Sequence, residues 1–175
     1  VPFIIAGPGI HPRQKPVEDL LTQPTIDLLP TLCELAGIPV PSSKPGISLA
    51  PFLKGEKQKR QHPYAASEWH SEYEVTVSPG RMIRSPRYKY THYLEGNGEE
   101  LYDMLKDKGE RRNLAHDPKY SKILAEHRAL LDDYIRRTQD DYRSLKVEAD
   151  KRWRSHAPGY PNHEGPCARD IINRK

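Results

Sequence analysis

Glutamate, tryptophan and histidine stand side by side at the end of one predicted β-strand, as Glu68, Trp69 and His70. Strand ends of this kind often contact ligands, because loops display binding groups on a rigid scaffold. Arg81 and Arg84 follow, and guanidinium groups donate paired hydrogen bonds to sulfate or carboxylate groups. A purely structural interpretation stays open, with Trp69 in a core, His70 on the surface and both arginines facing solvent. These five are the candidate substrate-binding residues.

Patterns typical of catalysis and of metal binding are missing from the sequence. No serine sits in a Gly-x-Ser-x-Gly elbow, and the histidines show no HExxH spacing. His163 and Cys167 are four positions apart but lack the second ligand pair of a zinc site. The Asp-Asp pairs at 132–133 and 140–141 fall on a predicted helix, where such pairs usually face solvent rather than bind calcium. We therefore predict neither a catalytic residue nor a metal site in this chain.

Composition restricts the classes of protein. The 175 residues are 35% hydrophobic and 30% charged, with 17 prolines, 2 cysteines and a formal net charge of +4. No stretch approaches the roughly 18–20 apolar residues that cross a bilayer, which excludes a transmembrane protein. The basic residues are scattered, which disfavours nucleic acid as a partner. Cys33 is expected to be a small buried hydrophobic residue, and a bridge from it to Cys167 stays open.

The first third of the chain predicts one strand and one helix. Val1–Ala6 is a short apolar run typical of a strand buried on both faces. Because such a strand needs neighbours that the sequence does not supply, we expect the chain to be a piece of something longer. Residues 20–37 predict a helix that begins late or bends because of Pro30, and Gly37 is expected to cap it in the left-handed conformation. Its apolar stripe comprises Leu21, Leu28, Leu29, Leu32, Leu35 and Ala36.

The rest of the chain predicts a small antiparallel sheet followed by a helix. Alternating segments joined by proline- and glycine-containing turns predict four strands, at residues 64–69, 81–84, 88–93 and 99–103. Asp117 before Pro118 is a helix start signal. Apolar residues then recur at intervals of three and four from Tyr120 to Leu145, which predicts one long amphipathic helix.

Six short motifs follow one another along the chain. They read VPFIIAGPG at 1–9, DLLPTLCELAGIP at 27–39, PGISLAPFLKG at 45–55, YKY at 88–90, ELYD at 100–103 and ERRNLA at 110–115. Each motif is weak alone, but their order is specific. Together, over residues 1–145, they resemble the C-terminal third of the sulfatases.

This resemblance implies an α/β fold of the alkaline-phosphatase and sulfatase type, of which the chain is one part. Residues 1–55 would be the end of the α/β domain, with its last strand and helix. Residues 62–146 would be a small antiparallel four-stranded sheet packed by a long C-terminal helix, and residues 147–175 an irregular tail.

The resemblance also implies an activity for the parent protein. Sulfatases hydrolyse sulfate esters or sulfamates with calcium and a formylglycine made from Cys or Ser in a C/S-x-P-x-R motif. Neither Cys33 nor Cys167 stands in such a motif. We therefore expect this chain to hold no cofactor and to be inactive alone, with the N-terminal part of the same sulfatase as the partner that supplies the nucleophile and calcium.

The role implied for this chain is to complete the fold and to wall the pocket for a sulfated small molecule or glycan. By the same resemblance, Glu68 and His70 would contact the alcohol or sugar part, and Trp69 would offer a stacking face. Two alternatives remain: a fragment of a phosphonate or phosphate monoester hydrolase of the same superfamily, and an anionic-polysaccharide-binding module. The compartment stays open, with periplasmic or extracellular placement suggested only by the resemblance.

Overall fold

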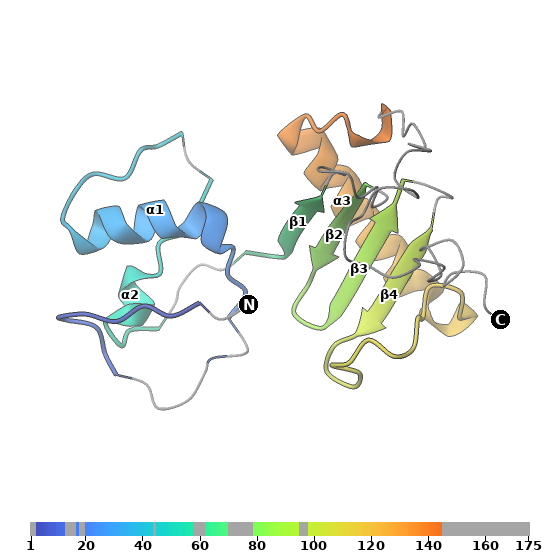
Figure 1. Ribbon diagram of the computed structural model, residues 1–175, viewed down its shortest axis with the longest axis horizontal. Helices are drawn as coiled ribbons and strands as arrows, with labels where there is room; N and C mark the ends of the chain where they lie inside the picture. The colour runs from blue at the N-terminus through green and yellow to red at the C-terminus, as the bar shows by residue number, and fades with distance from the viewer. Residues whose placement is uncertain are drawn as a thin grey trace, which may run out of the picture. The chain divides into compact units, whose positions relative to one another are not determined.

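The structure is a computed structural model that describes residues 3–12, 17, 20–43, 45–57, 62–69, 79–94 and 98–144. The chain divides into two compact units, Val1–Ala65 and Ala66–Lys175 (Figure 1). The tail predicted at residues 147–175 lies outside the described residues. Among the residues described, no helix is both long enough and apolar enough to span a membrane.

The first unit is built on a helix that ends as its sequence predicts. It contains α1 (Pro24–Leu35) and the short α2 (Ala50–Leu53). Gly37 follows α1 with φ at 69°, in the left-handed region. The N–H of Ile38 donates to the carbonyl of Cys33 at 2.8 Å, as in a Schellman motif. The predicted helix and its glycine cap are therefore confirmed, although Cys33 is half-buried rather than buried.

A buried carboxylate organises this unit. Asp27 on α1 is fully buried, and its Oδ2 accepts a hydrogen bond from the N–H of Gln23 at 2.7 Å. Its Oδ1 accepts from the N–H of Ile47 at 2.8 Å and lies 2.7 Å from Nε2 of His62. One turn later, the hydroxyl of Thr31 accepts from the N–H of Leu49 at 2.9 Å. These bonds tie α1 to two segments that follow it in sequence.

The middle of the apolar stripe of α1 is exposed in this unit. Leu28, Leu29 and Leu32 are 42%, 45% and 50% exposed, whereas Asp27 and Thr31 are fully buried. The hydrogen-bonded side of α1 faces the unit because the segment containing Ile47 and Leu49 needs partners for its backbone N–H groups. The apolar side is left uncovered.

The strand predicted over Val1–Ala6 does not form in the part that is described. Phe3 to Ala6 have no strand assignment, and Ile4 is 84% exposed. A strand is stable only when a neighbour satisfies its backbone groups, and no described residue pairs with this segment.

The second unit contains the predicted four-stranded sheet, which is confirmed. Its strands are β1 (Ala65–Trp69), β2 (Gly80–Arg84), β3 (Tyr88–Tyr93) and β4 (Glu99–Asp103), in the order β1-β2-β3-β4. The pairs β2–β3 and β3–β4 are antiparallel, with Ile83 opposite Tyr90 and Tyr90 opposite Leu101. These three residues are almost fully buried and form the middle of the core.

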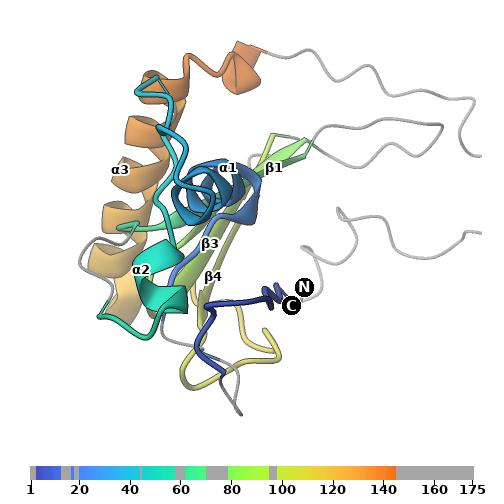
Figure 2. The ribbon, with the colours of Figure 1, turned by 90° about the vertical axis from the view of Figure 1, so that its left-hand side faces the viewer.

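A long helix covers one face of the sheet. It is α3 (Ser121–Thr138), preceded by the short η2 (Pro118–Tyr120), whose cap Asp117 accepts from the N–H of Lys119. Figure 1 shows α3 behind the sheet and slanted across the strands, and Figure 2 shows it to one side of them; α3 contacts β2 and β3. We call this side of the sheet the helix face, and the opposite side the second face.

The predicted extension of this helix to residue 145 is wrong. Gln139 takes the left-handed conformation, with φ at 55°, and α3 ends at Thr138. A separate turn, η3 (Tyr142–Ser144), follows, and Tyr142 is fully buried. The chain leaves the helix early because Tyr142 then enters the core, which a straight helix would prevent.

Candidate functional site

The candidate residues lie on β1 and β2 but do not gather on one side of the sheet. Glu68 and Trp69 are the last two residues of β1, and Arg81 and Arg84 lie on β2. Successive side chains of a strand point to opposite faces. Glu68 and Arg81 therefore belong to the helix face, and Trp69 and Arg84 to the second face. His70 lies outside the described residues.

Arg81 on the helix face is engaged by a carboxylate of the chain itself. Its Nε and Nη2 donate to the two carboxylate oxygens of Asp140 at 2.6 and 3.0 Å. The two side chains are only 7% and 10% exposed. Although burial lowers it, the carboxylate holds the pKa of Arg81 above its ordinary value, and hydrogen bonds from Arg81 lower the pKa of Asp140.

Two further contacts complete the surroundings of Arg81. Its Nη1 donates to the carbonyl of Trp69 at 3.1 Å and to that of Gly80 at 2.9 Å. Its guanidinium lies over the ring of Tyr142, 4.4 Å from the centroid. Burial raises the pKa of Tyr142 to about 12, which keeps the ring neutral. This arrangement holds the ends of β1 and β2 together.

Glu68 is exposed but bonded. Its Oε1 accepts a hydrogen bond from the hydroxyl of Tyr134 on α3 at 2.6 Å. Burial of Tyr134, and then this hydrogen bond, raises the pKa of the tyrosine. Glu68 is thus held against α3, with the rest of the carboxylate accessible to solvent.

Trp69 packs tightly on the second face. Its ring meets that of Tyr93 edge-on, with centroids 5.8 Å apart and planes at 65°. A Cβ added at Gly80 would lie 2.0 Å from the indole, so only glycine allows this approach. Trp69 remains half-buried, which leaves part of the indole available for stacking.

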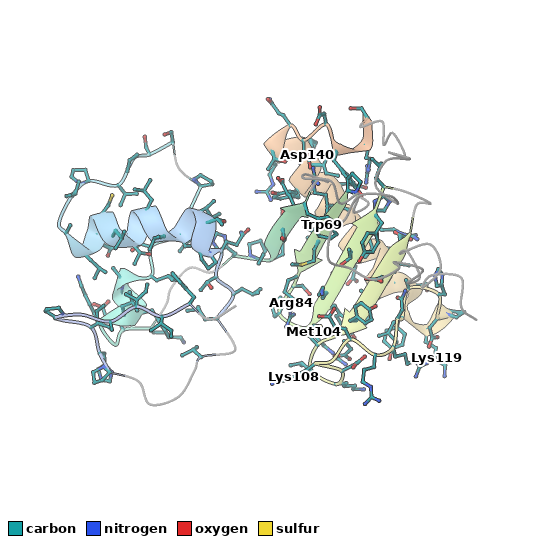
Figure 3. The ribbon with its side chains drawn as sticks, in the orientation of Figure 1. Trp69, Arg84, Met104, Lys108, Lys119 and Asp140 are labelled. Carbon is teal, nitrogen blue, oxygen red and sulfur yellow. The ribbon has the colours of Figure 1, made fainter. Side chains whose placement is uncertain are left out.

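Arg84, at the far end of β2 from Trp69, differs from Arg81 (Figure 3). Its Nη1 donates to the carbonyl of Ser85. Within the part of the chain that is described, Arg84 forms no ion pair. Burial lowers its pKa, although the charge of Glu110 opposes this effect. It is therefore a half-buried cation with donors that an anion could use.

Sequence reasoning missed three residues of this site: Tyr134, Asp140 and Tyr142. The pair Asp140–Asp141 was expected on a helix facing solvent, and for Asp140 this is wrong, because it lies beyond the end of α3 and binds Arg81. No local spacing indicates a contact across 59 positions. The described residues include no group of three or more His, Cys, Asp or Glu side chains that could hold a metal ion.

Comparison with known proteins places the chain among the sulfatases. The profile described as "N-sulphoglucosamine sulphohydrolase, C-terminal" matches residues 1–137. The Delta 4,5-hexuronate-2-O-sulfatase of Bacteroides thetaiotaomicron is 76% identical over 175 residues, which is 100% of this chain and 36% of that relative.

Two solved structures agree with this placement. One, described as a 2-O GAG sulfatase, has a TM-score of 0.81 and 76% identity, and the match covers 95% of this chain and 36% of that one. The other is a protein in complex with its substrate D-glucosamine-2-N,6-O-disulfate, with a TM-score of 0.61 and 27% identity over 69% of this chain and 25% of that one.

The chain thus spans about a third of the length of the relative and of the first structure, at 36% for each. The expected resemblance to the C-terminal region of sulfatases and the expected fold class are both confirmed. Because the profile covers most of the sequence, the chain belongs to the family of N-sulphoglucosamine sulphohydrolase C-terminal domains, the C-terminal region of sulfatases.

Proposed function

We propose that this chain is the C-terminal part of a sulfatase that removes the 2-O-sulfate group from an unsaturated (Δ4,5) hexuronate. The observation that carries the proposal is the 76% identity over all 175 residues with a Delta 4,5-hexuronate-2-O-sulfatase. The matched length includes both compact units, so the relationship does not rest on a single motif.

One role of the chain in this enzyme is to complete the α/β domain. Leu28, Leu29 and Leu32 on α1 are each at least 42% exposed. Fully burying a leucine contributes roughly 1.5–3 kcal/mol, and a row of leucines on one helix side is typical of a surface packed against other elements. We assign this surface to contact with the N-terminal part of the sulfatase.

The reactive groups are placed outside this chain. The resemblance leads us to expect a formylglycine nucleophile and calcium in the parent enzyme. The described residues do not fit such a centre, because they offer no cluster of metal-binding side chains. No bond-making step is therefore assigned to any residue here.

The second role is to wall the substrate pocket. Trp69 offers a half-buried indole for a sugar face, and Arg84 offers donors to a sulfate or carboxylate. Glu68 and His70 keep their proposed contact with the sugar hydroxyls. We do not assign Arg81 to substrate binding, because its N–H groups already bind Asp140 and two backbone carbonyls.

The test compares the complete sulfatase with the 175-residue chain. Sulfate release is measured from a 2-O-sulfated Δ4,5-hexuronate disaccharide, and we expect turnover only by the complete enzyme. Arg84→Gln should raise KM about tenfold, the effect of one lost hydrogen bond to a charged group. Trp69→Ala removes the stacking face and should also raise KM. The control, Arg136→Gln, alters an exposed arginine paired with Asp133 on α3 and should leave KM unchanged.

Each alternative has its own outcome in this experiment. Turnover by the chain alone would contradict the placement of the reactive groups. Preference of the complete enzyme for an aryl phosphonate would favour a phosphonate hydrolase. Tight, salt-sensitive binding of sulfated oligosaccharide by the chain alone, unaffected by Trp69→Ala, would favour a polysaccharide-binding module.

A further inference from the structure

A single guanidinium connects three elements of the second unit. Arg81 donates to the carbonyl of Trp69, the last residue of β1, and to the carbonyl of Gly80, the first residue of β2. It also donates two bonds to Asp140, just beyond the end of α3. The ends of two strands and the end of a helix therefore meet at one side chain.

Several contacts together fix the orientation of the Arg81 guanidinium at this junction. A guanidinium is planar, so its fork to the carboxylate of Asp140 also sets the direction of the N–H groups that reach the two carbonyls. The ring of Tyr142 lies 4.4 Å from the guanidinium, and its hydroxyl donates to the carbonyl of His92 at 2.9 Å. Arg81 thus has little freedom to rotate, and neither do the carbonyls it binds.

The junction lies next to the side chains proposed to contact substrate. The carbonyl that Arg81 binds belongs to Trp69 itself, and the indole packs on Gly80, whose carbonyl binds the same nitrogen. Glu68, one position earlier, is held by Tyr134 near the end of α3. A change at Arg81 or Asp140 therefore reaches Glu68 and Trp69 through the backbone.

We propose that Arg81 and Asp140 are positioning residues that orient Glu68 and Trp69 for binding of the sugar part of the substrate. This inference rests on the proposed pocket-wall role of the chain. Neither residue touches the ligand in this account, so the pair sets affinity for the substrate rather than the rate of the chemical step.

The test uses the complete sulfatase with Arg81→Lys and Asp140→Asn. Lysine keeps the charge but loses the planar fork, and asparagine keeps the shape but loses the charge. We expect each to raise KM roughly tenfold to a hundredfold, the effect of one lost hydrogen bond to a charged group such as Glu68. The change in kcat should be smaller, because a contact that binds substrate and transition state equally affects KM alone. Asp133→Asn is the matched control, because Asp133 is a half-exposed acid whose ion pairs among the described residues, with Arg136 and Arg137, lie within α3.

A double variant controls for loss of folding. Asp140→Asn leaves the buried charge of Arg81 unpaired, so this single variant can unfold the protein. The double variant Arg81→Gln/Asp140→Asn removes both charges together and should fold while showing the same rise in KM. Asp140→Glu retains the carboxylate and should restore part of the affinity.

The outcomes separate this inference from the proposed function. If the double variant lowers the melting temperature but keeps the wild-type KM, the pair is structural only and the inference is overturned. If Trp69→Ala raises KM while the double variant does not, the inference fails and the pocket-wall role stands. If neither raises KM, the pocket-wall role itself is wrong.

Discussion

The hydroxyl of Ser85, in the turn between β2 and β3, lies 2.9 Å from Nε2 of His127 on α3. The other ring nitrogen, Nδ1, lies 2.8 Å from the carbonyl oxygen of Ile123. A carbonyl only accepts, so Nδ1 carries the proton and Nε2 accepts from Ser85. His127 is buried and meets the ring of Tyr88 edge-on. The neutral imidazole therefore links the helix to the turn.

The first prediction concerns the pH dependence of stability. Burial lowers the pKa of His127 below its ordinary value of about 6.5. Below pH 6.5 the unfolded chain binds a proton that the native state resists, so the free energy of unfolding should fall as the pH drops. The slope for one proton is at most about 1.4 kcal/mol per pH unit. Urea unfolding between pH 5 and 7.5 measures this dependence of the free energy of unfolding on pH. The range lies above the pH at which paired carboxylates titrate.

The matched variants for this prediction are two histidine substitutions. His127→Gln should flatten the dependence of the free energy of unfolding on pH. His116 is exposed, and His116→Gln should leave this dependence as in the wild type. Equal slopes for wild type and His127→Gln would show that another group titrates.

The second prediction concerns Asn113, which follows β4. Its side chain forms hydrogen bonds with backbone groups at the outer edge of that strand. Its Oδ1 accepts from the N–H groups of Leu101 and Ala115 at 3.0 and 2.9 Å, and its Nδ2 donates to the carbonyl of Glu99 at 3.0 Å. Asn113→Ala should lower the free energy of unfolding by roughly 1–3 kcal/mol, since it leaves these groups unpaired. Asn113→Asp keeps the acceptor and should cost less. Thermal unfolding of both variants checks the order, and an equal loss would contradict it.

The third prediction concerns the contact of Trp69 with Gly80. In Gly80→Ala the new Cβ would lie 2.0 Å from the indole, so the ring must move. We expect a loss of stability of about 1–3 kcal/mol, as for overpacked cores, together with a shift in tryptophan fluorescence. Gly109→Ala is the control, because its nearest non-neighbour atom would lie at 3.5 Å and its φ is not positive. An unchanged emission spectrum for Gly80→Ala would contradict the contact.

The fourth prediction concerns Asp27. Asp27→Asn replaces one carboxylate oxygen with an amide that cannot accept, so one donor among Gln23, Ile47 and His62 loses its partner. The expected cost is roughly 1–3 kcal/mol in unfolding by urea. Glu34→Gln, which changes an exposed acid of the same helix, should be neutral. A neutral Asp27→Asn would mean that the carboxylate does not organise the first unit.

Several features of the fold could be predicted because they depend on neighbours in sequence. The alternation at residues 88–93 predicts β3, the cap at Asp117 predicts the turn before α3, and Gly37 supplies the left-handed residue that ends α1. The order of the six motifs likewise predicts the sulfatase family. None of these predictions needs to know what a side chain meets across space.

Other features depended on partners distant in sequence. Both Arg81 and Arg84 have the chemistry to bind an anion, but among the described residues only Arg81 has an acidic partner, because the chain after α3 turns at Gln139 and brings Asp140 to it. On α1, Asp27 is buried and three leucines of the apolar stripe are exposed, because Ile47 and His62 reach the carboxylate of Asp27.

By itself, then, the sequence determined α1, the four strands of the sheet, the start of α3 and the family they form, since local hydrogen bonding and side-chain periodicity act over a few residues. Only the tertiary structure decided which face of α1 is covered, where α3 ends and which arginine binds Asp140. Those outcomes depend on hydrogen bonds between groups 20 to 59 positions apart, and such bonds exist only once the elements have packed.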